Sequence, residues 1–341
     1  MSFKKTPLYE EDIRKALSSV VGLDRLNGRR IMILGSTGLI GSFMTDCLVY
    51  ADKGGAGIRV CAVSRSTERL RERFGKEKGG LSFAEADVSD DSIVKVLDAF
   101  DPDIVIHAAS ASYPAAFISK PVEIMKSNIS GAANILEYIK DKNHTRMVYV
   151  SSGEVLSRVD HTGERACYPV SKMAAETLCL SYIREYGTDV VIARPCHTFG
   201  PYVTASDNHA SAQFIRMAAD GEDIVLKSAG TQRRTYAYVA DCASSILSTA
   251  ALGDKGGIYD IATDETLSIK EFAEACAEAA GTKVISGEVT GQDIRERTSI
   301  DEQIMNYKGL ADIGWHPTFP LKDAIKRSVE QTMLMRGEKT D

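Results

Sequence analysis

Short apolar runs alternate with longer, helix-patterned stretches from about residue 30 to residue 196. Short runs of this kind are typical of strands, and their alternation with helices predicts a parallel sheet in an α/β fold. The expected strands are residues 30–34, 58–63, 81–85, 104–108, 147–151 and 190–193. The expected helices include residues 39–50, 65–74, 92–100, 122–140 and 169–186.

Three glycines lie in the segment 35–41, which follows the first expected strand and opens the first expected helix. A tight turn, a backbone that touches pyrophosphate and a helix packed hard against a strand all exclude side chains. The helix N-terminus that follows favours an anion. A plain glycine turn is the alternative, but the place between a strand and a helix favours a dinucleotide site. The residues expected to contact the dinucleotide here are Gly35, Thr37, Gly38, Leu39, Ile40 and Gly41.

The end of the second expected strand bears on which dinucleotide is bound. An Asp or Glu there would hold the ribose hydroxyls of NAD, but the strand ends in Ser64 and Arg65. Arg65 could meet a 2′-phosphate, which gives a slight preference for NADP over NAD; stacking on adenine or simple solvation is the alternative. Asp87 and Val88 follow the third strand, where an adenine contact is expected, although a surface turn would also account for Asp87.

The strand and helix pattern loosens past residue 197 into shorter elements and loops. This change predicts a smaller cap, interleaved with the first part because no linker is evident. We expect a Rossmann doubly wound parallel sheet with a smaller, interleaved C-terminal substrate-binding domain. The expected division is an N-terminal helical extension at 1–28, an NAD(P)-binding Rossmann domain at 29–196 plus about 233–263, and a substrate-binding domain at 197–232 and 264–335.

Composition narrows the possible partners and the compartment. A net charge of −6 argues against a nucleic-acid surface, which needs a basic face. No stretch approaches the roughly 18 apolar residues of a membrane span, and the N-terminus lacks the apolar core of an export signal. The 7 cysteines are scattered without CxxC spacing, which suggests reduced thiols in the cytoplasm and neither a disulfide framework nor a zinc site.

A tyrosine and a lysine four residues apart form the candidate catalytic group. Pro169 suits the first turn of a helix, so Tyr168 lies at the helix start and Lys172 one turn later on the same face. A tyrosine with its ordinary pKa of about 10 is a poor base at neutral pH, and a nearby ammonium would favour the phenolate. Ser151 or Ser152, after the fifth expected strand, can hydrogen-bond the reacting oxygen.

The ordered set of motifs resembles that of the extended short-chain dehydrogenase/reductases, the family of nucleotide-sugar epimerases, dehydratases and decarboxylases. The resemblance runs from about residue 30 to the C-terminal end. It implies tightly bound NAD or NADP, a nucleotide-diphosphate sugar as substrate, and a homodimer. The motifs that carry it are Gly35/Gly38/Gly41, His107-Ala108-Ala109, Asn128 within 127–131, Ser151-Ser152, Tyr168/Lys172, Arg194-Pro195, Phe199-Gly200-Pro201 and the segment 234–241.

The resemblance also implies roles for individual residues. Tyr168 would take a proton from a sugar hydroxyl as hydride passes to the nicotinamide, Lys172 would hold the nicotinamide ribose, and Ser152 would orient the oxygen. Arg234 would grip the diphosphate, for which a guanidinium is well suited; a solvated arginine is the alternative. The further cofactor contacts that it implies are Ala108, Ala109, Ser110, Asn128 and Pro195.

Glu154 bears on the reaction. The segment 151–155 is similar to the serine strand of dehydratases and UDP-glucuronate decarboxylases, which carry a glutamate at this place. Two residues past Ser152 on a strand, Glu154 would point to the same side and could act as an acid or base near the sugar C5; a capping carboxylate is the alternative. Gly153 stands where 4,6-dehydratases carry an acid, which counts against dehydration. A decarboxylase needs only oxidation at C4, loss of CO2 and return of the hydride.

Two histidines depart from the decarboxylase pattern, and both are candidate substrate contacts. His197 stands where these enzymes usually carry an Asn, and His209 where they carry an Arg. The spacing of His209 resembles that of the catalytic histidine of GDP-fucose synthase, an NADPH-using epimerase-reductase. The loop from Ser152 to Tyr168 is also shorter than in decarboxylases. We therefore predict a nucleotide-sugar-modifying enzyme with a 4-keto intermediate, decarboxylation slightly ahead of epimerisation; the alternatives are an NADPH-dependent keto-sugar reductase and a non-catalytic NAD(P)-binding sensor.

Overall fold

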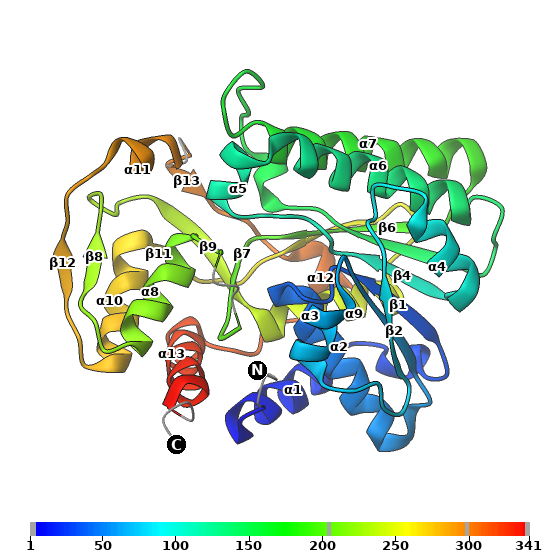
Figure 1. The fold of residues 1–341 in the computed structure, drawn as a ribbon, viewed down its shortest axis with the longest axis horizontal. Coiled ribbons are helices and arrows are strands. Elements are labelled where there is room, and N and C mark those ends of the chain that lie inside the picture. Colours follow the sequence, from blue (N-terminus) through cyan, green and yellow to red (C-terminus); the bar gives the residue numbers. More distant parts are fainter. Residues whose placement is uncertain (1–4, 203–205, 297–299, 338–341) are drawn as a thin grey trace.

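A seven-stranded parallel sheet lies at the centre of the computed structural model, which describes residues 5–202, 206–296 and 300–337 (Figure 1). The α/β fold expected from the sequence is confirmed. The strand order is β10-β6-β5-β4-β1-β2-β3, so the chain reverses its direction of travel through the sheet between β1 and β4. The strands are β1 Arg30–Leu34, β2 Arg59–Ser64, β3 Leu81–Glu85, β4 Ile104–His107, β5 Arg146–Val150, β6 Val190–Pro195 and β10 Ile258–Ile261.

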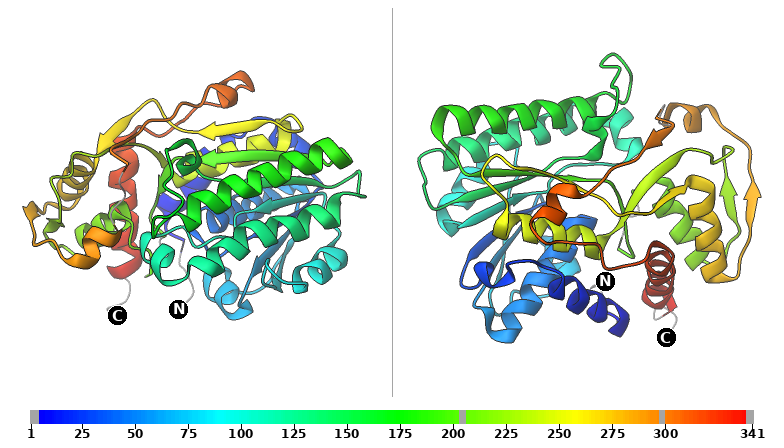
Figure 2. Two further views of the ribbon diagram at one scale, coloured as in Figure 1. Left: turned by 90° about the horizontal axis from the view of Figure 1, so that it is seen from above. Right: turned by 180° about the vertical axis from the view of Figure 1, so that it is seen from behind.

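Helices cover both faces of this sheet (Figures 1 and 2). Ile31 and Ile33 of β1 pack into one apolar cluster, whereas Met32 and Leu34 pack into another, because successive side chains of a strand point to opposite faces. The first cluster includes side chains of α1 (Pro7–Ser18), α2 (Leu39–Ala51), α3 (Thr67–Phe74) and α9 (Val239–Leu252). The second includes side chains of α4 (Ser92–Phe100), α6 (Pro121–Ile139) and α7 (Cys167–Tyr186).

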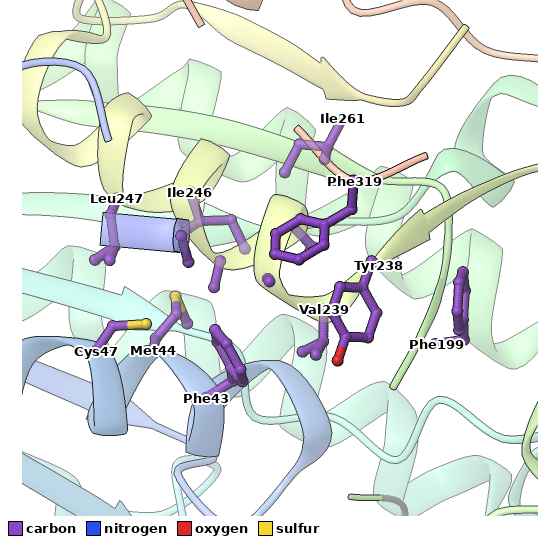
Figure 3. Close-up of a cluster of buried hydrophobic side chains, with 14 of the residues drawn as sticks. Phe43, Met44, Cys47, Phe199, Tyr238, Val239, Ile246, Leu247, Ile261 and Phe319 are labelled. Carbon is purple, nitrogen blue, oxygen red and sulfur yellow. The ribbon is translucent and has the colours of Figure 1, made fainter. Parts of the chain in front are cut away.

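Figure 3 shows the packing of α2 against α9 on the first face. The buried side chains in this contact are Phe43, Met44 and Cys47 from α2, and Val239, Ile246 and Leu247 from α9. Burial of one side chain of this size stabilises the fold by about 1.5–3 kcal/mol. The contact therefore fixes α2, and with it the glycine segment at its N-terminus, relative to the sheet.

The C-terminal third forms most of a smaller part around the strand β9 (Arg233–Tyr238). This strand pairs with β7 (His197–Phe199), β11 (Thr266–Ser268) and β13 (Glu302–Gln303), while β8 (Ile224–Leu226) pairs with β12 (Val284–Ser286). The helices packed together here are α8 (Ala210–Ala219), α10 (Ile269–Ala280) and α13 (Leu321–Gly337). Because β9 pairs within the smaller part, β9 belongs to that part. We therefore propose that the chain returns to the Rossmann domain near Val239 and not near residue 233.

The N-terminal helix α1 is packed into the fold. Its Tyr9 hydroxyl donates to Asp46 of α2 at 2.9 Å, and Arg73 of α3 donates to the same carboxylate at 2.5 Å. On another turn of α1, Asp12 accepts from the Tyr238 hydroxyl at 2.6 Å and from Arg327 of α13 at 2.7 Å. The extension expected before the first strand therefore links the large sheet to the smaller part.

Candidate active site

A pocket opens at the carboxyl ends of the central strands, across the point where the strand order reverses. Open parallel sheets bind their ligands at this place. The residues predicted from the sequence that line it are Gly35, Thr37, Gly38, Leu39, Ile40, Gly41, Ser64, Arg65, Asp87, Val88, Ala108, Ala109, Ser110, Ser152, Glu154, Tyr168, Lys172, Pro195, His197 and His209.

The backbone between β1 and α2 explains its glycines. Gly35 has a φ of 87°, in the left-handed region that glycine adopts without strain. A Cβ at Gly41 would lie 2.3 Å from the carbonyl oxygen of Gly35, so the first turn of α2 packs directly on the loop. The residues present thus fit a dinucleotide, whose pyrophosphate needs an open backbone at a helix N-terminus.

Arg65 lies at the expected adenosine end of the pocket, where it forms an ion pair with Glu123 of α6. Its hydrogen bond lowers the pKa of Glu123. The Arg65 side chain is 56% exposed, so a ligand in the pocket can reach it. Asp87 lines the same end and also holds a turn, because its carboxylate accepts from the Ser89 hydroxyl at 2.7 Å. Both interpretations of Asp87 are therefore compatible with its position.

Tyr168 lies in the first turn of α7 and is buried. Burial raises its pKa and the nearby charge of Glu154 adds to this rise, whereas the hydrogen bond with Ser152 opposes it. The Lys172 Nζ atom lies 5.9 Å from the centre of the Tyr168 ring. The phenol therefore keeps its proton in this structure, and further positive charge in the pocket would favour the phenolate.

Lys172 is buried one turn further along α7. Its Nζ atom donates to the carbonyl oxygen of Val150 at 2.7 Å, at the end of β5. Burial lowers the pKa of Lys172 to about 7, while the charge of Glu176 opposes the shift. The ammonium is thus held at the end of the serine-bearing strand, next to Tyr168.

The lowered pKa of Lys172 predicts a pH dependence of stability. Between pH 7 and about pH 10 the unfolded chain binds more protons at this lysine than the folded chain does, so its contribution to the free energy of unfolding rises with pH. The slope is at most about 1.4 kcal/mol per pH unit. Urea unfolding of cofactor-free wild type and Lys172→Met at several pH values should show wild type gaining relative to the variant as pH rises. A difference in the free energy of unfolding between wild type and variant that stays constant with pH would contradict the lowered pKa of Lys172.

The prediction that Glu154 lies on a strand is wrong. β5 ends at Val150, and residues Gly153–Leu156 form a 3₁₀ turn in which the Ser152 hydroxyl accepts from the Glu154 backbone N–H at 3.2 Å. A Cβ at position 153 would lie 2.2 Å from the sulfur of Met305, so a larger residue there would require the Met305 side chain to move. Glu154 nevertheless lines the pocket, and burial raises its pKa against the charges of Arg165, His209 and Arg234. A carboxyl group of this kind is suited to proton transfer.

The two candidate histidines approach the same pocket from the smaller part. His209 Nδ1 lies 2.8 Å from a carboxylate oxygen of Asp207, which also accepts from the His209 backbone N–H at 3.0 Å. Burial lowers the pKa of His197 to about 3, so this imidazole is neutral at neutral pH. The carboxylate of Asp207 fixes the orientation of the His209 ring.

Asn128 and Arg234 do not line the pocket. Asn128 is buried and donates to the hydroxyl of Ser171 at 2.9 Å, which joins α6 to α7. Arg234, expected to grip a diphosphate, donates from its guanidinium to the backbone carbonyls of Arg233, Ile300 and Asp301. Because the guanidinium donates its hydrogen bonds to these carbonyls, Arg234 ties β9 to the segment before β13.

Sequence reasoning missed several residues that line the pocket. Asp207 stands two residues before His209, and that spacing could have marked it as a partner for the imidazole. Glu123 and Gln303 carry no such signal. Gln303 reaches the pocket because β13 pairs with β9, and Glu123 because α6 runs beside the end of β2.

The fold and the site define a dinucleotide-binding α/β enzyme with a tyrosine, lysine and serine beside the cofactor pocket. Residues 31–262 match the family described as NAD dependent epimerase/dehydratase. The chain belongs to this family, whose cofactor is NAD. Among the described residues, no helix combines the length and the apolar character needed to cross a membrane.

Relatives agree with this assignment along most of the chain. The chain is 27% identical over 323 residues to UDP-glucuronic acid decarboxylase 6 of Arabidopsis thaliana, covering 90% of both. It is 24% identical over 316 residues to dTDP-D-glucose 4,6-dehydratase of Mus musculus, covering 89% of this chain and 88% of the relative. The fold is similar, with a TM-score of 0.75 at 21% identity, to UDP-glucose 4-epimerase of Thermotoga maritima solved with UDP-glucose, covering 91% of this chain and 99% of that one.

Proposed function

We propose that the chain modifies a nucleotide sugar through a 4-keto intermediate, and that decarboxylation of UDP-glucuronate is its first candidate reaction. The observation that carries this proposal is Glu154, which lines the same pocket as Ser152, Tyr168 and Lys172. The UDP-glucuronic acid decarboxylases among its relatives support the choice of substrate. The glycine at 153 argues against the dehydratase reaction of other relatives.

The residues divide the work of this reaction. When bound, NAD(P) would accept a hydride from the sugar C4 and return it. Tyr168 takes the proton of the 4-hydroxyl, Lys172 stabilises the phenolate charge, and Ser152 holds the oxygen. In the resulting β-keto acid the C5–C6 bond breaks, CO2 leaves, and its electron pair forms an enolate with the C4 oxygen. Glu154 then supplies a proton at C5, a role that burial favours because it raises the pKa of this carboxyl.

Incubation of the protein with UDP-glucuronate, without and with NAD or NADP, tests the reaction by mass spectrometry. Loss of CO2 without net consumption of cofactor is the expected result. Glu154→Gln should lower the rate about tenfold or more, since positioned proton transfer contributes at least that much, whereas Glu278→Gln on the exposed face of α10 should not change it. Unchanged UDP-glucuronate would refute decarboxylation.

A specific observation favours a second candidate, an NADPH-dependent keto-sugar reductase or epimerase. Asp207 orients His209 at the pocket wall, which gives the site a second proton-transfer group besides Glu154. If UDP-glucuronate is not consumed, a 4-keto nucleotide sugar should be supplied with NADPH. Oxidation of NADPH that His209→Gln abolishes would then establish the reductase.

For the cofactor, we propose that the chain accepts NADP in addition to NAD, with Arg65 meeting the 2′-phosphate. The absence of an acid after β2 and the exposure of Arg65 in the pocket support this. Arg65→Ala should weaken NADP binding about tenfold and leave NAD binding within twofold, because one charge-assisted contact is worth about 1.5 kcal/mol. Calorimetric titration with both dinucleotides measures this, and equal losses would contradict it.

We also propose a homodimer formed through α6 and α7. These helices pack side by side (Figures 1 and 2), and their outer surface carries the exposed apolar residues Val122, Met125 and Met173. Light scattering should give twice the mass of the chain, and a monomer would refute the proposal.

The cytoplasm is the proposed compartment, because all 7 cysteines are buried free thiols.

A further inference from the structure

A short helix outside the pocket wall contacts the proposed catalytic tyrosine. In α5 (Pro114–Ser119), the Phe117 ring is stacked on the Tyr168 ring, with centres 4.8 Å apart and planes inclined by 14°. Phe117 is fully buried and is not among the residues that line the pocket. The thiol of Cys167 donates to the Phe117 carbonyl at 3.4 Å, which ties α5 to the start of α7.

Cations lie close to both stacked rings. The guanidinium carbon of Arg165 is 5.2 Å from the centre of the Phe117 ring, and Lys172 Nζ is 5.9 Å from that of Tyr168. Stacked aromatic rings and cations over their faces attract one another. The plane of the Tyr168 ring is therefore fixed, and with it the direction in which its hydroxyl points.

α5 is held in turn from the smaller part of the fold. The backbone N–H of Ala115 donates to the side-chain oxygen of Asn208 at 3.0 Å. Asn208 stands between the pocket residues Asp207 and His209, and its own carbonyl accepts from Gln213 of α8 at 2.7 Å. Figure 1 shows α5 at the end of the α6–α7 layer that faces the smaller part.

We propose that Phe117 and Asn208 are positioning residues for Tyr168, which make alignment of the phenol depend on docking of the segment 206–209. The contacts run from Asn208 to α5, and through Phe117 to the Tyr168 ring. A substrate that steadies Asp207 and His209 also steadies this chain of contacts. The inference rests on the proposed catalytic role of Tyr168 and adds two residues that lie outside the pocket wall.

Steady-state kinetics test the positioning role. Phe117→Leu and Asn208→Ala should each lower kcat on the order of tenfold, with KM and the cofactor Kd within twofold, because a misplaced reacting group slows the chemical step. The double variant should be no slower than the slower single variant, since both act on one chain of contacts. Phe117→Tyr keeps the stacked ring and Asn208→Asp keeps the acceptor oxygen, so each of these conservative variants should have a kcat close to that of wild type.

A matched control separates positioning from general loss of packing. Phe319 is a buried phenylalanine packed on Tyr238, away from the pocket lining, and Phe319→Leu should leave kcat unchanged. The proposal is overturned if Phe117→Leu turns over like wild type, if the effects of Phe117→Leu and Asn208→Ala multiply, or if Phe319→Leu is as slow as Phe117→Leu.

A second readout needs no substrate, so it separates failure of this inference from failure of the proposed function. Fluorine NMR of protein labelled with 3-fluorotyrosine, with Tyr168→Phe for assignment, reports the surroundings of the Tyr168 ring. Asn208→Ala should move the Tyr168 signal toward its position in Phe117→Leu, and Asn208→Asp should not. A Tyr168 signal unmoved in Asn208→Ala would overturn the coupling even if the wild type turns over no nucleotide sugar.

Discussion

Tyr168→Phe is expected to lower kcat by about 10²–10⁴-fold, because the variant removes the hydroxyl that takes the substrate proton and leaves the ring in place. Tyr168 is buried, its hydroxyl hydrogen-bonds Ser152, and the Lys172 Nζ atom lies 5.9 Å from the centre of its ring. A phenylalanine fills almost the same space. Cofactor binding should stay within about twofold of wild type, since the glycine segment is untouched. Assays of product formation at fixed times measure kcat, and calorimetric titration measures cofactor binding.

The matched control is Tyr182→Phe on the same helix. Tyr182 donates to Glu137 at the surface and does not line the pocket, so its loss should change neither kcat nor cofactor binding. Turnover by Tyr168→Phe at the wild-type rate would show that another group is the base. Lost cofactor binding in this variant would instead mean that the tyrosine mainly holds the dinucleotide.

Gly41→Ala is expected to weaken cofactor binding on the order of 100-fold. The added Cβ would lie 2.3 Å from the carbonyl oxygen and 2.9 Å from the carbonyl carbon of Gly35, both backbone atoms that cannot rotate away. Overpacking of this kind costs about 1–3 kcal/mol, and the loop that must shift is the one predicted to cradle the pyrophosphate. Calorimetric titration with NAD measures the loss.

Gly54→Ala provides the control for this prediction. A Cβ at Gly54 has no neighbouring atom within 4 Å and its φ is not positive, so the substitution meets no obstacle. It should leave both cofactor affinity and thermal stability close to wild type. Undiminished NAD binding in Gly41→Ala would show that the dinucleotide does not depend on this turn.

Local sequence carried enough information for the fold and for the cofactor end of the site. Strand β1, the glycines at 35–41 and helix α2 follow one another directly, so the pattern of apolar residues and glycines determines their arrangement without distant contacts. Tyr168 and Lys172 are likewise one helical turn apart. Such features depend on backbone geometry over a few residues, which the sequence displays.

The substrate end of the site depended on contacts between distant segments. Arg234 carries a family motif, yet its guanidinium is taken up by carbonyls near residue 300, which only the pairing of β9 with β13 brings close. Glu154 lies on a 3₁₀ turn and not on a strand, and Met305, near the far end of the chain, packs against Gly153 in this turn. A strand pattern cannot foresee a neighbour about 150 residues away.

The sequence by itself therefore determined the α/β class, the dinucleotide loop and the tyrosine–lysine pair, since each is encoded within one or two adjacent elements. Only the tertiary structure decided that Phe117 stacks on Tyr168, that Asp207 orients His209 beside Glu154, and that Glu123 meets Arg65. These pairs join separate elements or both parts of the fold, and their side chains meet because the sheet and its connections bring them together.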